Sequence, residues 1–238
     1  MIGVRGSGEP ALQAPYDTNF GPTVGAIGED LKSEGALVYG LPYEAAKVAP
    51  FEAPTGQGEL EAQVWKYWRL ADGSRAQAAE AARNLTAWAL RFGDSLRGGS
   101  EQLQGDIITR VAQCPNQKIV LTGYSQGAWV IRKALDALSH LPNWNQIKDS
   151  ISGIGFVADP DHLLAPPELP KGLEDRTSGV CAPDDPVCNP PFTAAHSERC
   201  FPELTILCSH LRYGTESTPQ TEPKTGVQAV TDFLRKRL

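Results

Sequence analysis

Apolar and polar residues follow two spacings along this chain, one typical of buried strands and one typical of helices that cover a sheet. Short apolar runs predict strands at 2–5, 36–39, 119–122, 151–157 and 177–180. Apolar residues three or four positions apart predict helices at 23–32, 75–92, 101–112, 128–138, 143–148 and 226–238. Gly98 and Gly99 separate the second and third of these helices. Because strands alternate with helices, the pattern favours an α/β domain with a mostly parallel sheet covered on both faces.

The most informative position is Ser125, which stands between a predicted strand and a predicted helix. Its surroundings read Gly-x-Ser-x-Gly, from Gly123 to Gly127. A serine at such a junction sits on a tight, strained turn, and flanking glycines avoid collisions with the neighbouring strand or helix. The helix N-terminus beneath it favours developing negative charge. The arrangement predicts a nucleophile elbow; the competing interpretation is an ordinary glycine-flanked helix cap.

Composition narrows the class of protein. With 238 residues, 41% hydrophobic and 21% charged, the chain is typical of a single folded domain over 1–238 that buries a large core. The net charge of -6 and the lack of a basic run argue against a nucleic-acid partner. No stretch reaches the roughly 18 consecutive apolar residues of a membrane span, and no signal peptide follows Met1.

Four of the cysteines lie close together in a Pro- and Asp-rich stretch: Cys181, Cys188, Cys200 and Cys208. Short-loop disulfides fit this setting better than core thiols do. The alternative is a zinc site, but the chain has no Cys-x-x-Cys pair, so no metal is expected. Disulfides imply export, and we therefore expect a secreted protein whose N-terminus is mature, trimmed or mis-started here.

The histidines after Ser125 are the candidates for a catalytic base. A serine hydroxyl becomes a nucleophile when a base takes its proton and a carboxylate orients that base. In elbow-type hydrolases the partners follow in the order serine, acid, histidine. His210, just before the last helix, is the preferred base, and His196 is the alternative. His140 fits a helix cap and His162 lies in a turn sequence.

The preferred acid is Asp185, which lies between Cys181 and Cys188. A disulfide between these cysteines would stiffen a small loop and fix the direction of the carboxylate. The proline after Asp185 further constrains its backbone. Asp184 and Asp159 are the alternatives.

An acyl-transfer intermediate needs two or more hydrogen-bond donors aimed at its oxyanion. The backbone N–H of Gln126, directly after Ser125, is one candidate. Ser7, in the loop after the first predicted strand, can offer both its N–H and its hydroxyl. The competing interpretation of that loop is a turn of small residues without a binding role.

Five features together resemble the cutinase family of serine esterases, in its actinobacterial branch. The elbow from Gly123 to Gly127 matches the family's, including its Tyr and Gln. The loop at 181–188 resembles the family's disulfide-framed acid loop, with Asp185 in the acid position. The segment at 210–214 is similar to the family's histidine segment, and 5–7 to its oxyanion loop. Cys114 falls where the family keeps a disulfide cysteine.

The resemblance implies an α/β-hydrolase fold, a three-layer sandwich around a mostly parallel sheet of about five strands. It implies that Ser125, Asp185 and His210 hydrolyse carboxylic esters, with Ser7 and Gln126 at the oxyanion and without a metal or cofactor. Family substrates are cutin, short- and medium-chain acyl esters and lipids. We expect a monomer. A carbohydrate deacetylase of the acetylxylan type, a catalytically silent surface or binding protein, and a peptidase remain alternatives.

The chain also departs from the family pattern. The family partner of Cys114 lies upstream of the oxyanion loop, so we expect a longer native form to carry it. The stretch between Ser7 and Ser125 is longer than in compact fungal cutinases, and its 59–92 portion is a candidate cover for the site that disfavours polymeric cutin. Cys200 and Cys208 form an additional expected pair between acid and histidine.

Overall fold

The computed structural model describes residues 1–7, 9, 19–46, 75–160, 167–183, 185, 187–189, 210, 213–214, 221 and 223–238. Within these residues, five strands form one sheet in the order β2-β1-β3-β4-β5, and all neighbouring strands are parallel. The strands are β1 (Ile2–Val4), β2 (Tyr39–Gly40), β3 (Ile119–Tyr124), β4 (Ile151–Val157) and β5 (Thr177–Val180). The helices are α1 (Pro22–Ser33), α3 (Arg75–Gln113), α4 (Gln126–Ser139), α5 (Trp144–Ser150) and α8 (Gly226–Arg235), with a 3₁₀ turn η2 at Glu174–Arg176. The predicted α/β class is confirmed.

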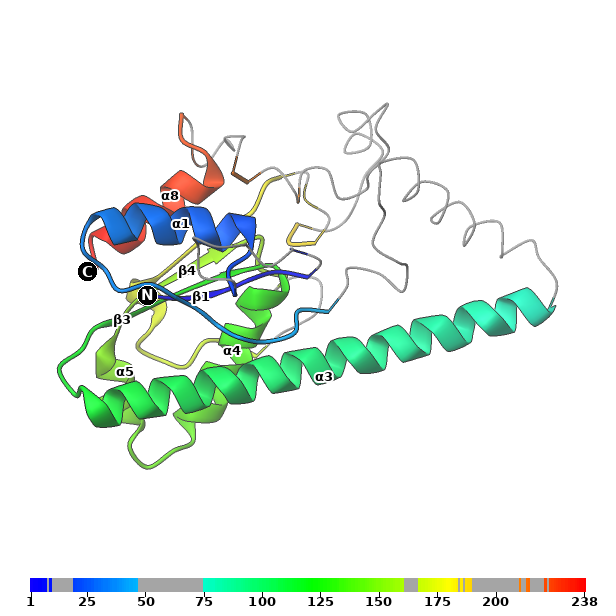
Figure 1. The fold of residues 1–238 in the computed structure, drawn as a ribbon, viewed down its shortest axis with the longest axis horizontal. Coiled ribbons are helices and arrows are strands. Elements are labelled where there is room, and N and C mark those ends of the chain that lie inside the picture. The colour runs from blue at the N-terminus through cyan, green and yellow to red at the C-terminus, as the bar shows by residue number, and fades with distance from the viewer. Residues whose placement is uncertain are drawn as a thin grey trace.

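The helices cover both faces of the sheet and give the molecule three layers (Figure 1). α1 and α8 lie together on one face, and α3, α4 and α5 lie on the other. Strand β3 contributes to both cores because successive side chains of a strand point to opposite faces. Ile119 and Leu121 pack on the side of α3 and α4, whereas Val120 packs on the side of α1 and α8.

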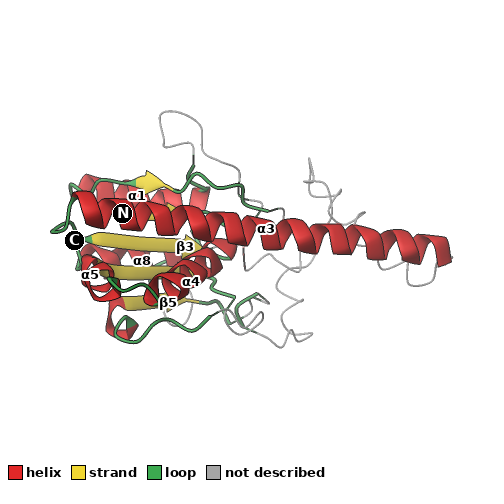
Figure 2. Cartoon of the chain, turned by 90° about the horizontal axis from the view of Figure 1, so that it is seen from below, coloured by secondary structure: helices red, strands yellow, loops and turns green. Residues whose placement is uncertain are grey.

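Helix α3 is a single helix of 39 residues, which corrects the prediction of two helices separated at Gly98 and Gly99. Gly99 lies where α3 packs closely on its neighbours. A Cβ atom there would come within 2.7 Å of Cδ2 of Tyr43 and 3.1 Å of Cγ2 of Val130. This glycine permits close packing and does not end the helix. The N-terminal part of α3 projects beyond the sheet (Figure 2).

The second strand is shorter than predicted, because β2 begins only at Tyr39. The preceding residues complete the end of α1 instead. The N–H of Ala36 donates to the carbonyl oxygen of Leu31 (3.1 Å), after a left-handed Gly35 with φ of 91°. A helix that ends in this way uses backbone groups that a strand would need for pairing.

Candidate active site

Ser125 occupies the predicted sharp turn between β3 and α4. Its backbone has φ 51° and ψ -116°, a left-handed conformation that is costly for any residue with a side chain. A Cβ atom on Gly127 would lie 2.0 Å from the carbonyl oxygen of Val4, and one on Gly123 would lie 2.7 Å from the backbone of α4. The two glycines therefore allow β1, β3 and α4 to approach closely enough to form the turn.

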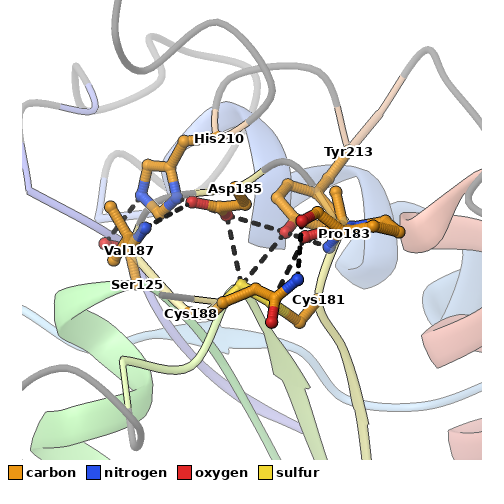
Figure 3. The surroundings of a disulfide bond; sticks show 10 residues. Ser125, Cys181, Pro183, Asp185, Val187, Cys188, His210 and Tyr213 are labelled. Carbon is orange, nitrogen blue, oxygen red and sulfur yellow. Dashed lines mark hydrogen bonds and ion pairs between the residues drawn. A yellow bond between two sulfur atoms is a disulfide. The ribbon is translucent and has the colours of Figure 1, made fainter. Parts of the chain in front are cut away.

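The structure brings together the three residues expected to form a triad (Figure 3). Nε2 of His210 lies 2.9 Å from Oγ of Ser125, and Nδ1 of His210 lies 2.8 Å from Oδ2 of Asp185. All three residues are buried, and Asp185 has no exposed surface. Because Nδ1 faces a carboxylate, it carries the proton, which leaves Nε2 free to accept the proton of Ser125.

A short disulfide loop holds Asp185. Cys181 and Cys188 are bonded, as predicted, and Asp185 lies between them. The N–H of Val187 donates to Oδ1 of Asp185 (2.8 Å), and the hydroxyl of Tyr213 donates to Oδ2 (2.7 Å). The sulfur of Cys188 lies 3.3 Å from Oδ2, but this contact is not a hydrogen bond because a disulfide sulfur carries no hydrogen.

His210 is held from strand β3 by Tyr124, the residue before Ser125. The hydroxyl of Tyr124 donates to the carbonyl oxygen of His210 (2.6 Å). The two rings also stack, with centroids 5.0 Å apart and planes inclined by 28°. Burial raises the pKa of Tyr124, so this hydroxyl remains a donor throughout the neutral range.

Both candidate oxyanion residues lie side by side. The hydroxyl of Ser7 donates to Oε1 of Gln126 (3.0 Å), and the N–H of Ala46 donates to the same oxygen (3.1 Å). Because a backbone N–H can only donate, the bond from Ala46 fixes which end of the Gln126 amide is the oxygen. Nε2 of Gln126 then donates to the hydroxyl of Ser95 on α3 (3.2 Å). The side chain of Gln126 thus joins three segments around the predicted oxyanion site.

The alternative candidates lie elsewhere or outside the described residues. Asp159 faces Arg132 on α4, with its Oδ2 at 2.6 Å from Nη2, whereas the carboxylate at Nδ1 of His210 belongs to Asp185. His140 is exposed near Asp136, and Cys114 is an exposed free thiol. Five further candidates fall outside the described part of the chain: Asp184, His162, His196, Cys200 and Cys208. Of the 59–92 segment, residues 59–74 also lie outside it, and the rest belongs to α3.

Three residues around the site escaped the sequence-based prediction: Tyr124, Tyr213 and Ser95. Tyr124 and Tyr213 lie within the motifs themselves, so their proximity to Ser125 and His210 was a usable signal. Ser95 is distant in sequence and had no such signal.

In the described part of the chain, no group of His, Cys, Asp and Glu side chains could hold a metal ion. Among the same residues, no helix has the length and apolar character of a membrane span.

The chain is similar to several known proteins. A family model described as Cutinase matches residues 52–222. Carboxylesterase Culp1 of Mycobacterium tuberculosis is 31% identical over 102 residues, which are 40% of this chain and 45% of that protein. Cutinase CUT1 of Coprinopsis cinerea is 30% identical over 121 residues, which are 51% of each chain. The matches therefore span about half the length of these relatives. A solved structure of an acetylxylan esterase, 17% identical, aligns over 99% of this chain and 97% of its own with a TM-score of 0.52.

Proposed function

Because the chain belongs to the cutinase family, we propose that it is a serine esterase that hydrolyses carboxylic esters. The single observation that carries this proposal is the continuous hydrogen-bonded series from Ser125 through His210 to Asp185. A serine on a strained turn, a histidine with an unprotonated Nε2 and a buried carboxylate are the groups that acyl transfer requires.

The proposed reaction proceeds through an acyl-enzyme. Oγ of Ser125 attacks the ester carbonyl carbon while Nε2 of His210 takes the serine proton. The imidazolium then gives that proton to the leaving alcohol as the C–O bond breaks. Water attacks the acyl-enzyme with His210 again as the base, which releases the acid and restores Ser125. Asp185 keeps the proton on Nδ1 and stabilises the imidazolium in both steps.

The backbone N–H groups of Gln126 and Ser7 are the proposed oxyanion donors. Gln126 is the first residue of α4, where N–H groups have no partner within the helix and the helix dipole favours negative charge. The hydroxyl of Ser7 is engaged with Oε1 of Gln126, so its hydrogen must turn away from that oxygen before it can serve as a further donor.

Several finer properties are part of the same proposal. The Cys181–Cys188 disulfide supports export, because such bonds persist in oxidising compartments. We propose a secreted monomer that acts on acyl esters or lipids. A carbohydrate deacetylase would use the same three residues, and the two activities differ in the acyl group that they prefer.

The test is hydrolysis of nitrophenyl esters from acetate to palmitate by the chain and by Ser125→Ala. Activity that peaks at butyrate to octanoate and disappears in the variant would support the esterase. Activity on acetate alone would favour the deacetylase. A folded, disulfide-bonded sample without activity on any ester would contradict the proposal and favour a silent scaffold.

A further inference from the structure

Tyr213 has a buried hydroxyl that touches the candidate acid but has no part in the reaction as described above. The hydroxyl donates to Oδ2 of Asp185 over 2.7 Å. This is the same oxygen that faces Nδ1 of His210 over 2.8 Å. One carboxylate oxygen therefore serves both the imidazole and the phenol, as Figure 3 illustrates.

The direction of the Tyr213 hydrogen bond follows from its other partner. The N–H of Ala182 donates to the Tyr213 oxygen over 2.7 Å, so that oxygen acts as an acceptor toward Ala182. Its own hydrogen is then free for the carboxylate of Asp185. Burial, followed by the nearby charge of Asp185, raises the pKa of Tyr213, which keeps the hydroxyl protonated at any pH of interest.

Helix α8 fixes the tyrosine from the other side. The N–H of Val227 donates to the carbonyl oxygen of Tyr213 (3.0 Å). Gly226, the first residue of α8, leaves room for the ring, since a Cβ atom there would lie 2.7 Å from Cδ1 of Tyr213. The tyrosine is thus clamped between α8 and the disulfide loop, and its hydroxyl has little freedom to leave Asp185.

We propose that Tyr213 is a positioning residue for the catalytic dyad of Asp185 and His210: it fixes the carboxylate and takes up part of its negative charge. This inference rests on the proposed function for its kinetic consequences, but not for the interaction itself. A carboxylate that shares its charge with a phenol stabilises an imidazolium less than one that does not. Removal of the hydroxyl should therefore make His210 easier to protonate.

The groups that face His210 in the described residues define what else could alter its protonation. They are Asp185 at Nδ1, Ser125 at Nε2, the stacked ring of Tyr124 and the edge of the Tyr213 ring. Glu9 lies near enough to raise the pKa of Tyr124 by its charge. Among these groups, Tyr213→Phe removes a hydrogen bond only from Asp185, and elsewhere it removes the acceptor of the Ala182 N–H.

The test compares Tyr213→Phe with Tyr43→Phe, a control in which another buried tyrosine loses a hydrogen bond, here to the carbonyl oxygen of Arg5. The midpoint of the acid limb of kcat against pH should rise by about 0.5 to 1 pH unit in Tyr213→Phe and stay unchanged in the control. At the plateau, kcat should fall about three- to tenfold with KM unchanged. Gly226→Ala, which pushes on the ring but keeps the hydroxyl, should move the midpoint in the same direction.

The same midpoint is measured directly by an NMR titration of the His210 ring, with each tyrosine variant made in a Ser125→Ala background. An upward shift there supports the inference even if the unmodified chain hydrolyses no ester, in which case only the proposed function fails. An active enzyme in which Tyr213→Phe lowers thermal stability but leaves the midpoint unchanged overturns the inference, because Tyr213 then only packs. A downward shift overturns the proposed sharing of charge, since it means that the main effect of the hydroxyl is to keep Asp185 close to His210.

Discussion

Substitution of Gly127 by alanine should separate two segments that meet at the candidate site. The added Cβ would lie 2.0 Å from the carbonyl oxygen of Val4 and 2.7 Å from that of Arg5. Real Cβ atoms essentially never approach other atoms within 3.0 Å, so α4 and the end of β1 must part by at least 3.0 - 2.0 = 1.0 Å. Both opposing atoms belong to the backbone, so no side chain can simply rotate away.

This displacement would move Ser125 and Gln126 away from the loop that carries Ser7. A misplacement of about 1 Å costs a reacting geometry roughly 100-fold in rate, so kcat/KM of Gly127→Ala should fall by about that factor. Overpacking of this kind costs about 1–3 kcal/mol of stability or more, which corresponds to a fall in Tm of about 2–12 °C for a chain of this size.

Gly105→Ala on α3 is the matched control. It is the same substitution at another helical glycine, but nothing lies within 4 Å of the added Cβ. Alanine is favoured over glycine in a helix, so this variant should gain about 0.5–1 kcal/mol and keep its activity. Both variants are compared by thermal unfolding and by ester hydrolysis. If Gly127→Ala keeps kcat/KM within threefold of the unmodified chain, the close contact with β1 does not set the site geometry.

Two further predictions concern the acid loop and α8. Replacing both Cys181 and Cys188 by alanine should lower the free energy of unfolding by about 2.5 kcal/mol, which is the loop-closure value for a ring of about eight residues. Chemical denaturation measures this difference, and an unchanged free energy of unfolding would contradict the prediction. A hydrogen bond and ion pair with Lys224 lower the pKa of Asp232 below its ordinary value of 3.8. The pair therefore stabilises the folded state fully above pH 3.8, and this stabilisation is lost as the pH falls through the lowered pKa. Asp232→Asn should therefore lower Tm at neutral pH and have no effect in strong acid, whereas an equal effect at both would refute the linkage.

The sheet and the elbow were predictable because their signals are local. A buried strand, a glycine on each side of Ser125 and an amphipathic helix occur within one short stretch of sequence. The continuity of α3 was not predictable in this way. Position 99 requires glycine because Tyr43, which is distant in sequence, leaves no room there for a Cβ atom. The sequence alone does not distinguish a glycine that ends a helix from one that permits close packing. The two roles differ only in the residues that contact the glycine in the folded protein.

The residues of the candidate site also fall into a group that the sequence predicts and a group that it does not. Ser125, Asp185 and His210 could be proposed because each stands in a motif and the three follow a fixed order. The network that links Ser95, Gln126 and Ala46 has no such order. Ser95 and Gln126 are common polar residues and Ala46 contributes only its backbone N–H, so their roles arise only when α3 crosses the N-terminus of α4.

His210 shows why the site depends on parts of the chain that carry out no chemistry. Its carbonyl oxygen is bound by Tyr124 at the end of β3, and its ring lies between Ser125 and Asp185. Each of these partners is fixed in turn by β3, by the elbow or by the disulfide loop. The histidine is therefore positioned by the C-terminal end of the central strand β3 and by the acid loop. It follows that substitutions at Tyr124 or in the 181–188 loop should disturb catalysis through the position of His210.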